Sequence, residues 1–418
     1  MDNENNNDKK IESRGIIGDL KVEQEQINQE EKELKKDIPL EKIDGINPIK
    51  NEKDIFGVLK KYKKIYFIIL IIMLATALVI LGLNLLNILN GPKGPKGPTE
   101  EEEMEKLINI DDPEDSLVKR KIDGVAVKNG EENLFPYSVV VENSIDARPL
   151  SGINEANVVY EALVEGNITR FLFVYANKDE IKKIGPIRSA RPYLLELADE
   201  YSPLFVHFGG SPEALNNINK GAYNITSLNG IVHDQVYFYR DVNLKAPHNA
   251  YISTELISKY LEKIENTENN GYYTSWIFND TLKEYKGAVV SRKFDVIYSK
   301  ENTLYNVFWK YNEETKDYTR YDRDDKTYLD DANNLVKTNN IIIQYASTSI
   351  LDKQLRKKID LTEGGKAIMI RDGNYVEGFW RKNNILNRTK FFSYDKDGNE
   401  VEYELKPGKI WIHILPKE

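Results

Sequence analysis

The sequence contains no cysteine among its 418 residues. Disulfide bonds, thiolate metal sites and cysteine nucleophiles are therefore all excluded. A lipid anchor attached through cysteine is excluded as well, so any attachment to a membrane must come from the protein chain itself. A part of the chain that works outside the cell must be held together by its hydrophobic core, which a chain of this length can supply.

Positive charge is in deficit, and histidine is rare. The formal net charge is -9, and only four histidines occur. A nucleic-acid-binding protein that is held by phosphate contacts usually has a basic face, so the net charge argues against a nucleic acid as partner. A small anion is not excluded, because one local pocket can bind it.

Long apolar runs are also absent, with one exception at residues 65–89, IYFIILIIMLATALVILGLNLLNIL. From Ile65 to Pro92 no charged residue occurs over 28 positions, whereas about 20 suffice to cross a bilayer. A cleaved signal peptide is excluded by the tail of 64 residues that precedes the run. The run therefore predicts one transmembrane helix.

The charges on either side of this run predict its orientation. Four lysines stand between residues 60 and 64, whereas GPKGPKGPTEEEE on the other side is weakly basic and then acidic. Positive charge favours the cytoplasmic side. We therefore expect a single-pass protein of the cell membrane with a cytoplasmic N-terminus, in which residues 1–64 are a polar, disordered tail and residues 90–115 are a Gly/Pro-rich and acidic linker.

Residues 116–280 alternate between strand and helix patterns. PYSVVVEN, ANVVYEALV, TRFLFVYA and PLFVHFGG are β-rich runs, and PYLLELADEY, PEALNNINK and TELISKYLEKIE have apolar residues at helical spacing. This order predicts an α/β domain in which helices cover a sheet. Residues 281–418 have almost no helical periodicity and predict a second, β-rich domain, with a short helix near LDKQLRKKI.

Three of the four histidines, His207, His233 and His248, fall within 42 residues of the α/β segment. The segment IGPIRSARPY places Arg188 and Arg191 just before a helix that begins at Pro192. A helix N-terminus disfavours cations but binds anions, so the two arginines are explained by an anionic ligand. The alternative is that they form salt bridges with Glu161 or Glu165.

Two further motifs lie in the same region. VHFGGSPEALNNI predicts a strand, two glycines and a helix capped by Ser211, which offers backbone donors to a ligand or forms an ordinary turn. YFYRDVNLKAPHNAYIS gathers polar side chains between tyrosines, a composition that suits sugars or peptides, or else a loop that pairs internally. The candidate ligand-binding residues are Arg170, Arg188, Ser189, Arg191, His207, Gly209, Gly210, Ser211, Arg240, Asp241, His248 and Asn249.

Other chemistry has weaker support. The histidines lack the i, i+4 spacing of a metal-binding helix, and we predict no metal and no cofactor. Neither Ser189 nor Ser211 lies in a G-x-S-x-G motif, which argues against a serine hydrolase. The run DKDGNE, which begins at Asp395, departs from a calcium-binding loop at Glu400 and Lys406 and predicts a hairpin turn instead.

Four stretches, ARPLSGINEANVVYEALVEGNITRFLFVYA, IGPIRSARPY, HFGGSPEA and YRDVNLKAPHNAYI, resemble the YerB-like family of bacterial lipoproteins, whose function is largely uncharacterised. The resemblance extends from Asp123 to the C-terminus and implies an N-terminal domain, a C-terminal domain and an envelope location. This chain departs from the family in lacking the lipidated cysteine, and in Lys245, where arginine is common. The family motifs single out Arg148, Glu161, Glu165, Arg170, Gly185, Pro186, Arg188, Ser189, Arg191, His207, Gly209, Arg240, Asp241, Pro247, His248 and Asn249.

These observations favour a binding or regulatory protein of the cell envelope. Its ligand would be an anionic or sugar-containing molecule, such as a cell-wall fragment or an anionic glycopolymer, and its partner a protein of cell-wall synthesis. The alternative is an enzyme that acts on phosphorylated glycopolymers or lipid-linked pyrophosphates, with arginines stabilising charge and a histidine as acid or base. A third possibility is a structural protein in which the arginines only form salt bridges.

Overall fold

The computed structural model describes residues 117–266, 271–382 and 388–417. The predicted tail at residues 1–64, the predicted transmembrane helix at 65–89 and the predicted linker at 90–115 lie outside the described residues. Within these described ranges, no helix is both long enough and apolar enough to cross a bilayer.

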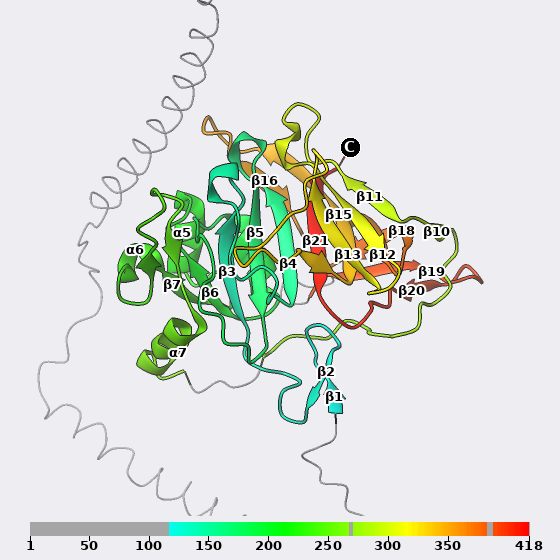
Figure 1. Ribbon diagram of the computed structural model, residues 1–418, viewed down its shortest axis with the longest axis horizontal. Coiled ribbons are helices and arrows are strands. Elements are labelled where there is room, and N and C mark those ends of the chain that lie inside the picture. The colour runs from blue at the N-terminus through cyan, green and yellow to red at the C-terminus, as the bar shows by residue number, and fades with distance from the viewer. Residues whose placement is uncertain (1–116, 267–270, 383–387, 418) are drawn as a thin grey trace, which may run out of the picture. The chain divides into compact units, whose positions relative to one another are not determined.

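The first part of the described chain alternates strands and helices, as its sequence predicts (Figure 1). Its strands are β1 (Leu117–Lys119), β2 (Ala126–Lys128), β3 (Tyr137–Glu142), β4 (Val158–Leu163), β5 (Thr169–Tyr175), β6 (Leu204–His207), β7 (Thr226–Asn229), β8 (Tyr239–Arg240) and β9 (Ala250–Tyr251). Its helices are η2 (Ile145–Ala147), η3 (Glu165–Asn167), α4 (Pro192–Asp199), α5 (Pro212–Asn219), α6 (Gly230–His233) and α7 (Thr254–Lys263). The predicted helix starts at Pro192 and Pro212 are confirmed, since proline is the first residue of α4 and of α5.

The second part is rich in strands, which confirms the β-rich prediction. Its strands are β10 (Val289–Val290), β11 (Lys293–Val296), β12 (Val307–Asn312), β13 (Asp317–Asp322), β14 (Lys337–Thr338), β15 (Asn340–Ile350), β16 (Lys357–Asp360), β17 (Gly365–Arg371), β18 (Asn374–Arg381), β19 (Lys390–Tyr394), β20 (Glu400–Glu402) and β21 (Ile410–Pro416), with one short helix η4 (Thr303–Tyr305). The run that begins at Asp395 forms the turn between β19 and β20, as predicted.

The short helix predicted near LDKQLRKKI is wrong. The Asp352 side chain accepts hydrogen bonds from the backbone N–H groups of Gln354 and Arg356, which closes a turn in place of a helix. The chain then returns as β16, whose Lys357 pairs with Ile350 of β15. A local side-chain-to-backbone interaction therefore outweighs the helical propensity of this stretch.

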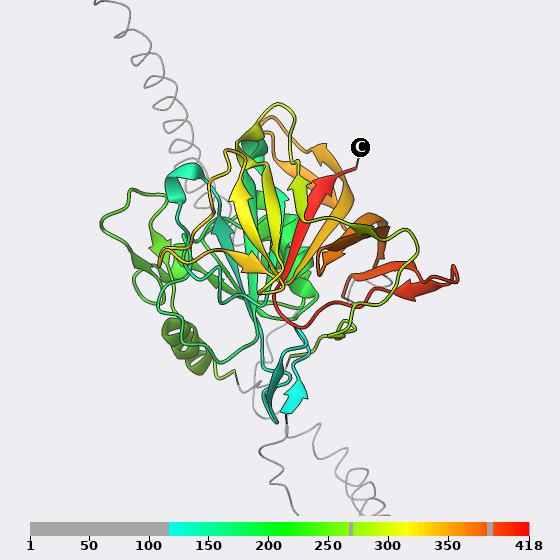
Figure 2. The ribbon, with the colours of Figure 1, turned by 45° about the vertical axis from the view of Figure 1, so that its right-hand side comes forward.

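One sheet of thirteen strands contains strands from both parts of the described chain. Its main order is β20-β19-β18-β17-β15-β21-β4-β5-β3-β6-β7, with β10 and β16 at its sides. The last strand, β21, lies between β4 and β15 and is parallel to both (Figures 1 and 2). Because of this pairing, the end of the chain joins the α/β part to the β-rich part through backbone hydrogen bonds.

Different layers cover the two faces of this sheet. On one face, α4 contributes Leu194 and Leu195 to a core that includes Val140 of β3 and Ile412 of β21. On the other face, a four-stranded sheet of order β11-β12-β13-β14 brings Trp309 into a second core. Each face of the large sheet is thus buried, which explains why its central strands are apolar on both sides.

Six strands of the large sheet run in the same direction. β3, β6 and β7 are mutually parallel, β4, β21 and β15 are mutually parallel, and β5 is antiparallel to both β3 and β4. The carboxyl ends of the six strands and the start of β5 therefore lie at one edge, which we call the carboxyl edge. Ligand sites of sheets with parallel strands lie preferentially at this kind of edge.

Candidate functional site

A row of ionisable side chains lies at the carboxyl edge. We call it the charge row and define it as Glu142, Glu165, Arg170, Arg188, Arg191 and His248. Four of these residues were among the predicted ligand-binding residues. The two carboxylates were not, although the family resemblance singled out Glu165.

Glu142, at the end of β3, holds one end of the charge row. His248 Nδ1 lies 2.8 Å from Glu142 Oε2, and Arg188 Nε lies 3.7 Å from Glu142 Oε1. The Glu142 residue is only 3% exposed. Because a carboxylate accepts the hydrogen from Nδ1, it fixes the orientation of the His248 ring.

Arg191 and Glu165 form the other end of the charge row. Arg191 donates through Nε and Nη2 to the two Glu165 carboxylate oxygens at 2.8 and 2.9 Å, a bidentate pair. Burial alone would raise the pKa of Glu165, but the charge and hydrogen bonds of Arg191 outweigh burial and lower the pKa to about 2. The salt-bridge alternative therefore describes Arg191, and Arg188 also forms an ion pair, although with Glu142. Glu161 pairs elsewhere, with Arg320.

Arg170 occupies the middle of the charge row and differs from its neighbours. It is 7% exposed, it donates from Nη1 to the Ser189 carbonyl oxygen at 2.9 Å, and its buried Nε has no hydrogen-bond partner. Among the described residues, Arg170 forms no ion pair. Burial, together with the charges of Arg191 and Arg188, lowers its pKa to about 10, while the charge of the nearby Glu165 carboxylate partly opposes this shift.

Two backbone contacts hold the segment that carries Arg188 in place. The Arg188 N–H donates to the Val140 carbonyl oxygen of β3 at 2.9 Å, and the Ile187 N–H donates to the Ala250 carbonyl oxygen of β9 at 2.8 Å. The segment thus lies as an added strand between β3 and the β8–β9 hairpin. This backbone arrangement directs the arginines along the carboxyl edge in front of α4.

Gly209, Gly210 and Ser211, the strand-Gly-helix motif, form the turn between β6 and α5 and the cap of α5. Gly209 has φ +70°, and its N–H donates to Asn229 Oδ1 at 2.9 Å. A Cβ on Gly210 would lie 3.3 Å from Ala190 Cβ, a tight contact that glycine avoids where the two segments approach each other. Ser211 caps α5, because its hydroxyl accepts from the Ala214 N–H at 3.3 Å.

His207 lies inside the protein and not in an open pocket. Its Nδ1 is 2.6 Å from the Gly209 carbonyl oxygen, its Nε2 is 2.9 Å from Ser227 Oγ, and the residue is 0% exposed. Burial lowers the pKa of His207 to about 4. The ring is therefore neutral at pH 7 and acts as a hydrogen-bonded part of the core.

The polar loop between β8 and β9 forms a rim beside the charge row. Arg240 donates to Asp234 and, at 3.0 Å, to Asn249 Oδ1, while Asp241 accepts from Lys183 Nζ at 2.9 Å. The charged side chains of this loop are therefore hydrogen-bonded to nearby residues, which agrees with the alternative of an internally paired loop. His248 is the member of the loop that reaches the charge row.

A metal site does not emerge from the residues that the structure describes. No group of three or more His, Asp or Glu side chains among them is positioned to hold a metal ion. The positive charge of three arginines at the charge row instead suits an anion.

Sequence reasoning missed Glu142, and it named Glu161 as a partner of Arg188 or Arg191, whereas the partner of Glu161 is Arg320. Glu142 ends the apolar run YSVVVE, and Glu161 interrupts the apolar run VVYEAL. A carboxylate in a strand that is buried on both faces needs a cationic partner. The interruption of each apolar run by one acidic residue was the signal that could have identified them.

Comparison with known proteins agrees with the resemblance in the motifs. Residues 123–267 match the family described as "Protein of unknown function (DUF3048) N-terminal domain", and residues 294–412 match the corresponding C-terminal domain. The chain belongs to this family. It is 33% identical over 302 residues to the Bacillus subtilis protein named "Putative lipoprotein YerB", covering 72% of this chain and 86% of that protein. The crystal structure of B. subtilis YerB is similar, with a TM-score of 0.60 and 32% identity, covering 72% of this chain and 97% of that chain.

The family assignment confirms the resemblance to YerB-like proteins. It also agrees with an N-terminal and a C-terminal region, each with its own family match. The names of these relatives state no ligand, reaction or partner.

Proposed function

We propose that this chain is a binding protein of the bacterial cell envelope that takes an anionic ligand at the charge row. One observation supports this most strongly: Arg170 is a buried cation without an ion-pair partner in the described part of the chain. Burying a charge is costly unless the charge is paired. An anionic ligand group would supply the missing partner.

The roles of the arginines differ in this proposal. Arg170 anchors the ligand, because its guanidinium retains an unused donor. Arg188 approaches Glu142 at 3.7 Å and flanks the anion, while Arg191 is already held by Glu165 and adds positive charge. Residues Arg240, Asp241 and Asn249 of the rim stand beside this place and contact sugar or other polar parts of the ligand.

The envelope location in this proposal has two supports. The chain has an uncharged run at residues 65–89 that is long enough to cross a bilayer. Its relative in B. subtilis carries the name of a lipoprotein, and lipoproteins are anchored to membranes. In this proposal a single transmembrane helix replaces the lipid anchor and places residues 116–418 outside the cytoplasm, within reach of cell-wall polymers and of proteins that synthesise them.

The test is thermal unfolding of the full chain in detergent, with and without pyrophosphate as the anionic probe. A ligand that binds only the folded protein stabilises it by about 2.7 kcal/mol at a concentration 100 times its Kd, so Tm rises. We expect Arg170→Gln to abolish this rise. The matched control is Arg381→Gln. Arg381 is an exposed arginine of β18 that pairs with Glu400, and its replacement should preserve the rise in Tm.

The Arg170→Gln variant also tests the stability of the protein without ligand. Because Arg170 lacks an ion-pair partner, its replacement by neutral glutamine should leave Tm of the ligand-free protein unchanged or raise it. Equal ligand-induced shifts in R170Q and in the parent protein would remove Arg170 from the site. If pyrophosphate produces no shift at all, the proposed anion site is wrong.

A catalytic function is the second candidate, and the Glu142–His248 pair favours it. A histidine that is oriented by a buried carboxylate and lies beside arginines is suited to act as a general acid or base in phosphoryl chemistry. The measurement is phosphate release from a lipid-linked pyrophosphate by the full chain. Phosphate release by the parent protein that is lost in H248Q would support an enzyme. If the parent protein releases no more phosphate than R170Q, binding remains the function.

A further inference from the structure

Two cavities of the C-terminal part lie on either side of residues 299 and 300. The first has a volume of about 340 Å³ and the second about 360 Å³, and Ser299 and Lys300 line both. We call them together the basic groove. The charged residues that line it are Lys293, Asp295, Lys300, Glu301, Arg323 and Lys357.

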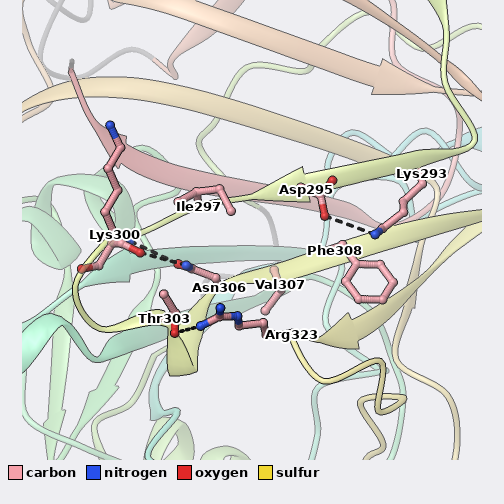
Figure 3. Close-up of a pocket in the computed structure, with 10 residues that line it drawn as sticks. Lys293, Asp295, Ile297, Lys300, Thr303, Asn306, Val307, Phe308 and Arg323 are labelled. Atoms are coloured by element: carbon pink, nitrogen blue, oxygen red, sulfur yellow. Dashed lines mark hydrogen bonds and ion pairs between the residues drawn. The ribbon is translucent and has the colours of Figure 1, made fainter.

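Positive charge dominates the basic groove. Figure 3 shows Lys293, Lys300 and Arg323 on three sides of the first cavity. Lys293 Nζ lies 3.5 Å from Asp295, whereas Arg323 donates to the Thr303 hydroxyl group. Among the described residues, neither Lys300 nor Arg323 forms an ion pair, so two cationic groups remain available to a ligand.

The basic groove adjoins the charge row through one turn of the chain, η3. Glu165 begins this turn and binds Arg191 of the charge row. Asn167 ends the turn, lines the second cavity and accepts a hydrogen bond from Lys357 at 3.2 Å. Leu163 and Pro416, at the ends of β4 and β21, line the same cavity, so the groove also lies at the carboxyl edge.

We propose that the ligand is a linear polyanion with repeated phosphate groups, which lies in the basic groove and extends across the η3 turn to the charge row. This inference rests on the proposed function, because the charge row is one end of the extended site. A single phosphate fills only one of these positions. A chain of phosphodiester-linked units fills several at once, and each further contact adds affinity without a new association step.

The lining of the groove favours a phosphodiester glycopolymer over a single-stranded nucleic acid. Proteins that bind single strands stack the bases on accessible aromatic rings. The aromatic residues that line the groove are covered, because Phe308 is 5% exposed and Tyr298 is 4% exposed. The groove therefore offers cations and hydroxyl groups but no platform for bases.

The experiment compares pyrophosphate with long-chain poly(glycerol phosphate) by titration calorimetry on the full chain in detergent. We expect the polymer to bind about tenfold more tightly at equal phosphate concentration. The variant K300Q/R323Q should lose this advantage, and the slope of log K against log salt should fall by about two, one for each cation removed. Both side chains are exposed, so the substitutions should leave Tm of the free protein unchanged.

The matched control is Lys396→Gln, which removes an exposed lysine on the β19–β20 turn. It should change neither the affinity for pyrophosphate nor the affinity for the polymer. If pyrophosphate binds through Arg170 but the polymer binds no more tightly, the extended site is wrong while the proposed function stands. If R170Q leaves polymer binding intact, the charge row is not part of the site and the proposed function is overturned. Tighter binding of oligothymidylate than of a polymer with equal charge would overturn the glycopolymer assignment.

Discussion

Glu161 of β4 and Arg320 of β13 form a completely buried ion pair. Arg320 Nη1 lies 2.7 Å from Glu161 Oε2 and Nη2 lies 3.0 Å from Oε1, and both side chains are 0% exposed. Trp411 of β21 and Thr169 of β5 also donate to the carboxylate, at 3.2 and 2.8 Å. The pair therefore joins the four-stranded sheet to the strands of the α/β part at the point where β21 is inserted.

The first prediction concerns this ion pair. Glu161→Gln keeps the shape of the side chain but leaves the Arg320 charge buried without a partner, which should lower the free energy of unfolding by about 3–5 kcal/mol. Urea unfolding followed by tryptophan fluorescence measures the loss, because Trp309 and Trp411 are buried beside the pair.

A double variant and a surface control make this prediction specific. E161L/R320M removes both charges and should recover most of the stability that E161Q loses. Glu255→Gln, at an exposed pair with Lys259 on α7, should change stability by less than about 0.5 kcal/mol. A loss of under about 1 kcal/mol in E161Q would show that the pair does not hold the two sheets together.

The second prediction concerns pH and His207. Its pKa is about 4 in the folded protein and about 6.5 in the unfolded chain, so the unfolded chain binds the proton more strongly between these values. The stability from neutral His207 is present above pH 6.5 and is lost as pH falls toward 4, by up to roughly 3 kcal/mol.

The difference between the parent protein and H207N isolates this contribution. Asparagine keeps a donor toward the Gly209 carbonyl oxygen but does not titrate. Urea unfolding at a series of pH values should therefore show a shallower loss of stability in H207N between pH 6.5 and pH 4. Parallel curves would mean that His207 takes up its proton over the same pH range in the folded protein as in the unfolded chain.

Local patterns in the sequence predicted most individual strands and helices. The four apolar runs of the first part formed β3, β4, β5 and β6, and Pro192 and Pro212 began helices where expected. Each of these features depends on neighbours within a few residues, such as a cap or an apolar alternation. The helix predicted near LDKQLRKKI was wrong because of another local interaction, the Asp352 turn, which competes with a helix.

The shared sheet and the partners of the arginines depend on contacts between distant residues. β21 lies beside β4 although about 250 residues separate them, and no local pattern specifies which strands will be neighbours. Similarly, His248 meets Glu142 across 106 residues of sequence. The sequence could place the cations near Pro192 but could not show which of them a carboxylate would neutralise.

The third prediction tests the charge row through the Glu165–Arg191 pair. Glu165 has a pKa of about 2 and is therefore ionised at pH 7, where it competes with an anionic ligand for Arg191. Glu165→Gln should strengthen pyrophosphate binding several-fold, up to about tenfold, which corresponds to about 1.4 kcal/mol. Titration calorimetry at pH 7 measures this change, with Glu255→Gln as the control.

The direction of this change separates two roles of Glu165. Stronger binding means that its charge opposes the ligand. Weaker binding would mean that Glu165 is needed to hold Arg191 in position, and it would refute the competition between Glu165 and the ligand for Arg191.

The fourth prediction concerns Glu196 of α4, a partly buried carboxyl group. Burial raises its pKa to about 7, and the nearby Asp360 and Glu213 carboxylates add to this shift, while Lys382 partly opposes it. The folded protein therefore binds this proton more strongly than the unfolded chain, in which the pKa is about 4.3. The stability from the protonated form is present below pH 4 and is lost as pH rises through 7.

Glu196→Gln mimics the protonated group at every pH. Because part of the side chain faces water, we expect a gain of about 1–2 kcal/mol at pH 8 and almost none at pH 5. Urea unfolding of E196Q and of the parent protein at the two pH values measures this difference, and E255Q should show no such dependence. An equal effect of E196Q at pH 5 and pH 8 would show that the folded protein does not retain the Glu196 proton, because only a group that titrates between these values makes the effect depend on pH.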